Sequence, residues 1–163
     1  MAISANGCIA DTKGNTPWSD DEWKQFQKHV NGCGNMVIGR KTYEVMAKGK
    51  AFDAVNNPSV VVVSRSLKIK NKNGFTVVQS PQQALLLLKK AGYKTITVAG
   101  GTQLNSAFIK QGLVDEMILD IEPVLIGKGM PLLASSAFMQ SLKLLGTSRY
   151  KGGISLRYGI IKS

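Results

Sequence analysis

The sequence contains a single histidine, His29, and only two cysteines, Cys8 and Cys33. One histidine argues against a Ser-His-Asp triad and against a histidine-rich metal centre, so no metal site is predicted. Two cysteines make neither a disulfide framework nor a zinc site, which favours a reduced, cytoplasmic protein. No apolar run approaches the length of a membrane span and no signal peptide follows Met1, so a membrane protein is not expected.

Acidic residues are also few. Ten aspartates and glutamates stand against 21 lysines and arginines, which gives a formal net charge of +11. A basic balance favours polyanionic partners, which include nucleic acid, anionic lipid and phosphorylated cofactors or substrates. The lysines are scattered, and their densest stretch, residues 68–73, is predicted to be a loop. The length of 163 residues, with 44% hydrophobic and 19% charged residues, predicts one globular domain over residues 1–163.

Apolar runs that suit strands alternate with helical patterns along the chain. Continuous apolar runs, such as residues 60–63, suit strands that are covered on both faces in a parallel sheet. The predicted strands cover residues 1–5, 35–38, 60–64, 75–78, 95–99, 116–121 and 154–161.

Four helices are predicted between these strands. Ser80 offers an N-cap, Pro81 follows at the first helical position, and Gly92 is a plausible stop. The other three helices are expected from residue 19 onward, over residues 41–46, and from residue 104 to 111. The alternation predicts an α/β fold of three layers with a mostly parallel central sheet. Because no helix separates the last two predicted strands, an antiparallel C-terminal edge is expected.

Three predicted strand ends carry groups that suit anions, and ligands of open α/β sheets bind beyond such ends. A Gly-Arg-Lys turn at residues 39–41 begins a helix, whose free N–H groups favour an anion. Ser64-Arg65 offers a hydroxyl and a guanidinium, which suit a phosphate monoester. Gly100-Gly101 allows the backbone to approach a pyrophosphate closely. Each motif alone could be a turn, a surface ion pair or a solvated loop, but together they favour a dinucleotide with an extra phosphate.

Glu22 is the candidate acid of the first third of the chain. It lies four residues before Phe26, so the two side chains share a helix face. A carboxylate beside aromatic residues can lose water and hold an amidine-like group. The alternative is that Ser19 and Glu22 form a capping box, in which Glu22 only stabilises the start of the helix.

These motifs resemble, in type and order, those of dihydrofolate reductases. The segments that carry the resemblance are Pro17-Trp18, Glu22 with Phe26, residues 39–44, Val63-Ser64-Arg65 and residues 98–101. Residues 112–127 are more similar to the reductase domain of riboflavin biosynthesis, which shares the fold and the use of NADPH. The resemblance therefore implies a dihydrofolate reductase-like fold and NADPH as the cofactor.

The resemblance implies reduction of 7,8-dihydrofolate to tetrahydrofolate in one-carbon metabolism, by hydride transfer to the pterin ring. The implied catalytic residues are Glu22, which would bind the pterin, and Trp18. Residues 9–18 match the mobile loop that closes over the site. The implied substrate-binding residues are Ile3, Glu22, Trp23, Phe26, Met46 and Asp120. The implied cofactor-binding residues are Ala2, Ile9, Gly39, Arg40, Lys41, Thr42, Ser64, Arg65, Val98, Gly100, Gly101, Thr102, Gln103 and Leu104.

The sequence also departs from the pattern of the dihydrofolate enzymes. Leu104 stands where they usually have a tyrosine, and residues 56–58, Asn-Asn-Pro, stand where an arginine binds the folate glutamate. Lys48 or Lys50 could replace that arginine, with a looser geometry than a bidentate guanidinium.

Asp120 stands where the dihydrofolate enzymes have a threonine bonded to the catalytic acid. In that alignment Asp120 lies near Glu22, and one of two such close carboxyls has a raised pKa. The alternative is that Asp120 ends its strand and meets solvent.

The leading hypothesis is an NADPH-dependent reductase of dihydrofolate. The alternative is an NADPH-dependent reductase of another heterocycle, such as the ribityl-aminopyrimidinone of riboflavin biosynthesis. A third hypothesis is a basic nucleic-acid-binding protein, but the sequence offers neither an aromatic-plus-basic ladder nor a helix-turn-helix for it. The expected partner is a small-molecule substrate, with no nucleic acid and no membrane.

Overall fold

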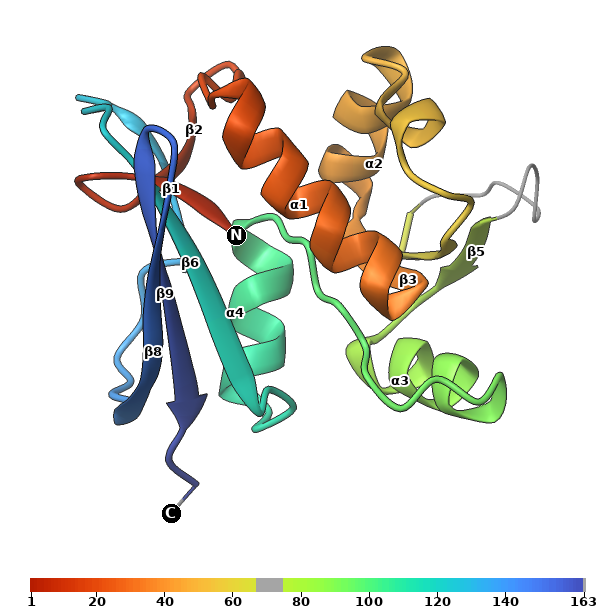
Figure 1. Ribbon diagram of the computed structural model, residues 1–163. Coiled ribbons are helices and arrows are strands. Elements are labelled where there is room, and N and C mark those ends of the chain that lie inside the picture. Colours follow the sequence, from red (N-terminus) through yellow and green to blue (C-terminus); the bar gives the residue numbers. More distant parts are fainter. Residues whose placement is uncertain (67–74, 163) are drawn as a thin grey trace. The chain divides into compact units, whose positions relative to one another are not determined.

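The computed structural model describes residues 1–66 and 75–162, and the basic stretch at residues 68–73 lies outside them. The chain forms two compact units (Figure 1). Unit 1 consists of Met1–Gln25 and Asn105–Ser163, and unit 2 of Phe26–Leu104. Helix α1 (Asp20–Cys33) begins in unit 1 and ends in unit 2, whereas α4 (Thr102–Lys110) begins in unit 2 and ends in unit 1.

Unit 2 is built on a three-stranded parallel sheet with the order β3-β4-β5. The strands are β3 (Asn35–Gly39), β4 (Ser59–Val63) and β5 (Phe75–Val78). The helices are α2 (Arg40–Lys48), the 3-10 helix η1 (Ala51–Ala54) and α3 (Pro81–Lys90). The continuous apolar runs thus form parallel strands, as their composition predicts.

The predicted strand at residues 95–99 is wrong in extent, because its pairing with β3 is one isolated bridge between Val98 and Val37. The N–H of Val37 donates to the carbonyl of Thr97 at 2.7 Å, and the N–H of Ala99 donates to the carbonyl of Val37 at 2.9 Å. The side chain of Asn35 explains the difference. Its amide Nδ2 donates to the carbonyl of Thr95 at 2.7 Å, and its Oδ1 accepts from the N–H of Thr97 at 3.2 Å. A side chain thus takes backbone groups that a neighbouring strand would otherwise pair.

The core of unit 2 is apolar and well buried. It consists of Val30, Met36, Ile38, Met46, Val55, Val60 and Val62. The rings of Tyr43 and Phe75 lie against it, with centroids 4.7 Å apart. Burial of these side chains fixes α2 against β3 and β4, which in turn fixes the turn between β3 and α2.

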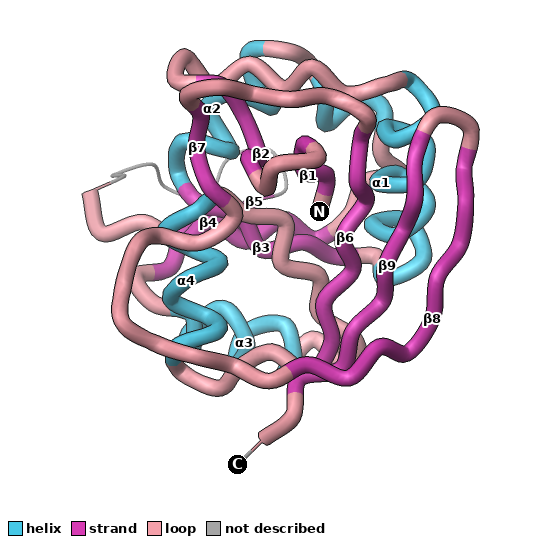
Figure 2. The backbone as a smooth tube through the Cα atoms, turned by 90° about the vertical axis from the view of Figure 1, so that its left-hand side faces the viewer, coloured by secondary structure: helices cyan, strands magenta, loops and turns pink. Residues whose placement is uncertain are grey.

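Unit 1 contains a four-stranded sheet with the order β1-β6-β9-β8. The strands are β1 (Ala2–Ser4), β6 (Glu116–Glu122), β9 (Gly153–Ile160) and β8 (Leu142–Tyr150). β1 and β6 are parallel, whereas β6, β9 and β8 are antiparallel to their neighbours and lie side by side in Figure 2. The predicted antiparallel C-terminal edge is therefore confirmed, with one strand more than expected.

Three strands were not expected from the sequence. They are β8 and the pair β2 (Cys8–Asp11) and β7 (Gly129–Pro131), which form a separate two-stranded sheet. β2 and β7 are too short for an apolar alternation, and most of β8 is exposed. Their pairing depends on partners far away in the sequence, which a local pattern does not contain.

The fold class is mixed α/β, with parallel strands, an antiparallel C-terminal edge and four α-helices in the described part of the chain. The predicted cap of α3 is confirmed, since Ser80 Oγ accepts from the N–H of Gln83 at 3.2 Å. Within residues 1–66 and 75–162, no helix combines the length and the apolar character needed to cross a bilayer.

Candidate active site

Two glutamates stabilise the start of α1, Glu22 through its backbone N–H and Glu122 through its side-chain carboxylate. Ser19 Oγ accepts from the N–H of Glu22 at 3.2 Å, as an N-cap residue does. The N–H of Ser19, however, donates to Glu122 Oε2 at 2.8 Å, and its hydroxyl donates to Glu122 Oε1 at 3.2 Å. The capping-box alternative is therefore wrong for the Glu22 side chain, because Glu122 takes the place that the box would give to it.

The Glu22 carboxyl is buried without a protein partner. Only 4% of the residue is exposed, and its carboxyl accepts no hydrogen bond from any residue within 1–66 and 75–162. Burial raises the pKa of Glu22 from 4.5 to about 7. The α-amino group of Met1 opposes this rise, while the charges of Asp120 and Glu122 add to it. Near neutral pH this carboxyl is thus available in both protonation states.

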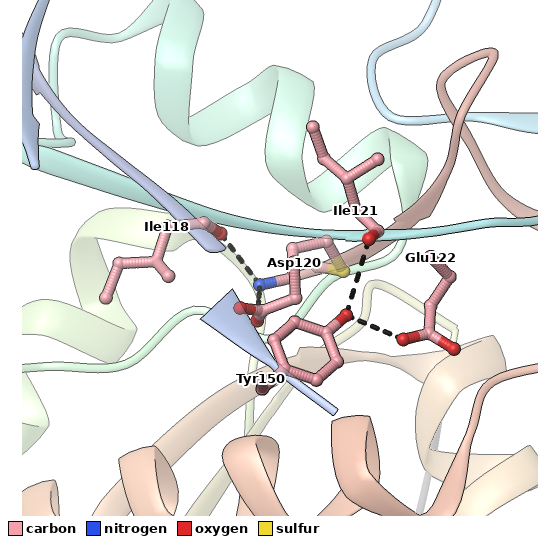
Figure 3. A network of polar contacts seen from close by, with 6 residues as sticks. Ile118, Asp120, Ile121, Glu122 and Tyr150 are labelled. Carbon is pink, nitrogen blue, oxygen red and sulfur yellow. Dashed lines mark hydrogen bonds and ion pairs between the residues drawn. The ribbon is translucent and has the colours of Figure 1, made fainter. Parts of the chain in front are cut away.

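Asp120 lies within β6, between β1 and β9, and is 1% exposed. Its Oδ2 lies 3.6 Å from the α-amino nitrogen of Met1, which also donates to the carbonyl of Ile118 at 2.8 Å (Figure 3). Its Oδ1 is buried and has no hydrogen-bond partner in the described structure. The alternative that Asp120 meets solvent at a strand end is wrong, because β6 continues to Glu122.

Glu122 and Tyr150 complete this cluster and were missed by the sequence analysis. The hydroxyl of Tyr150 donates to Glu122 Oε1 at 2.6 Å and lies 3.5 Å from the carbonyl of Ile121 (Figure 3). Burial, and then the carboxylate of Glu122, raise the pKa of Tyr150. The signal available in the sequence was a glutamate at the end of a largely apolar strand. Its partners could not be predicted from a local pattern, because the bonds of Glu122 span 28 and 103 positions.

In unit 2, three side chains with hydrogen-bonding groups meet at the carboxyl ends of β3 and β4. Arg40 Nη1 donates to Ser66 Oγ at 3.2 Å, and the N–H of Ser66 donates to Ser64 Oγ at 3.3 Å. Arg40 Nε also lies 3.6 Å from Glu44 Oε1, in an exposed ion pair. The predicted anion groups Arg40 and Ser64 are thus brought together, by a serine that the sequence analysis did not select.

The two predicted glycine turns of unit 2 also meet. The N–H of Gly39 donates to the carbonyl of Gly100 at 2.7 Å, and the Gly100-Gly101 peptide bond is cis. Gly100 has a φ of 89°, a backbone conformation that residues other than glycine rarely adopt. A β-carbon on Gly39 would lie 3.6 Å from the oxygen of Gly100. The end of β3 and the 100–101 turn therefore form one backbone-lined corner.

The other expected site residues divide between the units. In unit 1, Ala2 and Ile3 are buried in β1, whereas Ile9, Trp18 and Trp23 are half-buried. In unit 2, Met46 belongs to the apolar core and Phe26 packs against it. The remaining residues of unit 2 range from buried Leu104, through half-buried Thr42, Val98, Gly101 and Thr102, to exposed Lys41, Arg65 and Gln103.

The described residues contain no group of three or more histidines, cysteines, aspartates or glutamates arranged to hold a metal ion. Taken by itself, unit 1 contains a buried cluster of carboxyls around the start of α1. Taken by itself, unit 2 contains an arginine, two serines and a glycine-lined corner at its strand ends. The first arrangement suits a ring with N–H donors, and the second suits phosphate groups.

Comparison with known proteins gives a match to the family model of the RibD C-terminal domain over residues 1–156. The chain is 25% identical over 166 residues to the uncharacterized protein YwjB of Bacillus subtilis, covering 97% of this chain and 94% of that protein. It is 28% identical over 114 residues to the dihydrofolate reductase HdrB of Haloferax volcanii, covering 67% and 57%, respectively.

Among solved structures, the fold matches the diaminohydroxyphosphoribosylaminopyrimidine deaminase/5-amino-6-(5-phosphoribosylamino)uracil reductase of Thermotoga maritima. The TM-score is 0.74 at 16% identity, over 98% of this chain and 55% of that one. This likeness concerns the fold, and the chain spans about half of that bifunctional protein.

Proposed function

Because the chain belongs to the RibD C-terminal domain family, we propose that it is an NADPH-dependent reductase of an aminopyrimidine. The substrate would be of the kind named for the Thermotoga maritima relative, 5-amino-6-(5-phosphoribosylamino)uracil. The observation that carries the proposal is the buried Glu22 carboxyl, which no described protein group satisfies. A buried acceptor without a protein partner is costly unless a ligand supplies the donor.

The groups of unit 2 fit the phosphates of NADPH. Arg40 is exposed and keeps N–H groups beyond the one bonded to Ser66, and a guanidinium suits the 2′-phosphate. Ser64 and the exposed Arg65 are the other groups proposed to contact this phosphate. The Gly100-Gly101 turn would lie against the pyrophosphate, since neither glycine carries a side chain of its own over the backbone N–H groups. When bound, NADPH supplies the hydride.

Glu22 has two roles in this proposal. Its carboxyl binds an N–H group of the pyrimidine ring and thereby fixes the orientation of the ring. Its pKa of about 7 also allows it to hold or release a proton near neutral pH, as a group close to a proton-consuming reduction must. Ser19 and Glu122 keep the first turn of α1 in place, so the Glu22 backbone is fixed while its carboxyl stays available.

Dihydrofolate is the second candidate substrate. The similarity to HdrB and the position of an acidic residue at the start of α1 favour it. The segment at residues 56–58 weakens it, because no arginine is present there to bind the folate glutamate. The N–H of Asn56 instead donates to Asn31 Oδ1 at 2.9 Å, within unit 2.

The test is NADPH oxidation measured with 5-amino-6-(5-phosphoribosylamino)uracil and, separately, with dihydrofolate. We expect turnover with the pyrimidine, and a loss of at least a hundredfold in kcat/KM for Glu22→Gln. Asp115→Asn is the control, because it removes the same charge from an exposed residue of unit 1. Turnover of dihydrofolate alone would select the second candidate, and oxidation with neither substrate would refute both. Unchanged turnover in Glu22→Gln would remove Glu22 from its role.

A further inference from the structure

The described part of unit 1 buries three carboxyls close together, and they are compensated unequally. Glu122 accepts three hydrogen bonds, from the N–H and hydroxyl of Ser19 and from the hydroxyl of Tyr150. Asp120 has one charged neighbour, the α-amino group of Met1, on Oδ2 alone. Glu22 has no hydrogen-bonded partner for its carboxyl among the described residues. The first carboxyl is therefore satisfied by the protein, and the other two are not.

Asp120 Oδ1 is a fully buried acceptor without a partner, and the Glu22 carboxyl is an acceptor that receives no hydrogen bond from a described residue. Both residues are more than nine-tenths buried, at 1% and 4% exposure. Asp120 and Glu122 are two positions apart in β6, so their side chains share one face of the sheet, and Glu122 bonds to Ser19 at the start of the helix that carries Glu22. The groups that act on Glu22 and Asp120 are the α-amino group of Met1, directly before β1, Glu122 from β6 and the Tyr150 hydroxyl from β8. Together they supply one positive charge against three carboxyls.

Folded proteins rarely leave a buried acceptor without a donor, and where they do, a ligand or a bound water is the usual explanation. A metal ion does not fit, because the described residues form no metal-binding group. The unsatisfied atoms are acceptors only, so the missing partner must donate hydrogen bonds. To bond to both carboxyls, that partner must carry hydrogen-bond donors on at least two of its atoms.

We propose that Asp120 Oδ1 accepts a hydrogen bond from the substrate beside Glu22, so that the site selects a pyrimidine carrying N–H donors for two carboxyls. This inference rests on the proposed function for its substrate class and adds the requirement for a second donor. A 5,6-diaminopyrimidinone edge meets it, since adjacent amino groups and ring N–H groups all donate. A ring whose donors are methylated does not meet it.

Binding of two uracil probes to the full chain, without NADPH, tests the proposal. The first probe is 5,6-diaminouracil, and the second is 1,3-dimethyluracil, which keeps the ring but lacks the donors. We expect wild type to bind the first more tightly, and Asp120→Asn to weaken it about tenfold, because one bond to a charged acceptor is lost. Asparagine keeps the shape, but it offers either an uncharged oxygen or a second donor. Asp120→Thr, a β-branched residue suited to a strand, is expected to weaken the same probe.

Asp115→Asn is the charge-matched control and should leave both affinities unchanged, as Asp120→Asn should leave that of 1,3-dimethyluracil within twofold. Folding of each variant is checked by thermal melting. A measurement on the wild type needs no variant: the side-chain carboxyl 13C signal of one buried aspartate should move on addition of 5,6-diaminouracil, while those of exposed aspartates stay. No measurable binding to wild type, no moving signal, or equal binding to Asp120→Asn and wild type would each overturn the proposal.

This experiment separates the two claims. A chain that binds 5,6-diaminouracil through Asp120 but never oxidises NADPH would retain the inference and refute the proposed function. A chain that oxidises NADPH with the pyrimidine but binds the probe equally well without Asp120 would do the reverse.

Discussion

In a capping box, one glutamate makes both hydrogen bonds with the N-cap residue, but at the start of α1 these two bonds come from Glu22 and Glu122. Glu22 lies at the third helical position, where its N–H reaches Ser19 Oγ, but the return bond to the N–H of Ser19 comes from Glu122 on β6. This exchange leaves the Glu22 carboxyl without a hydrogen bond from a described residue, which is the basis for the ligand-binding role proposed for it. A residue that stabilises the helix is thereby separated from a residue that can bind a ligand.

The raised pKa of Glu22 predicts a pH-dependent stability. A carboxyl that binds its proton more tightly in the folded state stabilises the fold at low pH. This contribution is complete below pH 4.5 and is lost as the pH rises through about 7. The free energy of unfolding should therefore fall by up to about 3 kcal/mol over this range, since one pKa unit corresponds to about 1.4 kcal/mol. Denaturant unfolding of wild type and Glu22→Gln at both ends of the range measures it.

Glu22→Gln should lose most of this pH dependence, while Asp53→Asn, at an exposed position, should keep it. Equal slopes for wild type and Glu22→Gln would contradict the burial of an unpartnered carboxyl at position 22.

Arg40 gives a prediction about cofactor choice. If its guanidinium binds the 2′-phosphate, Arg40→Gln should weaken NADPH binding about tenfold and leave NADH binding nearly unchanged, because only NADPH carries that phosphate. Isothermal titration with each nucleotide measures both affinities. Arg157→Gln is the control, since Arg157 is paired with Glu116 at 2.7 Å in unit 1. Equal losses for both nucleotides in Arg40→Gln would assign Arg40 to another part of the cofactor.

The sequence predicted the residues whose role depends on their neighbours in the chain. Ser80 caps α3 as expected, and Ser19 caps α1 as the capping-box alternative proposed for that residue, because an N-cap acts within three positions. Ser66, Glu122 and Tyr150 could not be found in this way, since each acts on a residue brought near by folding.

At the scale of elements, the β8–β9 hairpin carries Tyr150 to Glu122. The turn between these strands allows this only because residue 153 lacks a side chain: a β-carbon there would overlap the Tyr150 ring and lie 2.7 Å from the carbonyl of Ile121. Gly153 thus leaves room for the Tyr150 ring, Tyr150 bonds to Glu122, and Glu122 bonds to Ser19 at the start of α1.

Gly153→Ala should destabilise the protein by about 1–3 kcal/mol, the usual cost of forcing extra atoms into a packed site. Gly146→Ala is the matched control in the same hairpin, because a β-carbon at Gly146 would meet nothing within 4 Å. Chemical denaturation of both variants measures the difference. Equal stability of the two variants would show that Tyr150 does not need the position described here.

The elements that sequence patterns predicted best are those with strong local signals. β5 has the predicted bounds, and α3 begins at the predicted cap. The expected strand at residues 95–99 was overestimated because the side chain of Asn35 replaces a backbone partner. β2, β7 and β8 were missed because short or exposed strands are defined by their partners rather than by their own residues.

At the scale of the whole molecule, the net charge of +11 acts on anionic ligands. A strongly positive protein attracts a polyphosphate cofactor at long range, and salt screens that attraction. The dissociation constant of NADPH should therefore rise several-fold between low and physiological ionic strength. Fluorescence titration of NADPH at the two salt concentrations measures this, with uncharged 5,6-diaminouracil as the control. An NADPH affinity that does not depend on salt would contradict a cofactor site built from cationic groups.

In the proposed function, the chain transfers a hydride from NADPH to an aminopyrimidine. The most direct test uses NADPH carrying deuterium at both C4 positions of the nicotinamide, with 5-amino-6-(5-phosphoribosylamino)uracil as the acceptor. Mass spectrometry of the product should show the gain of one deuterium for each NADPH oxidised. A product without deuterium, or no product while NADPH stays reduced, would contradict the claim.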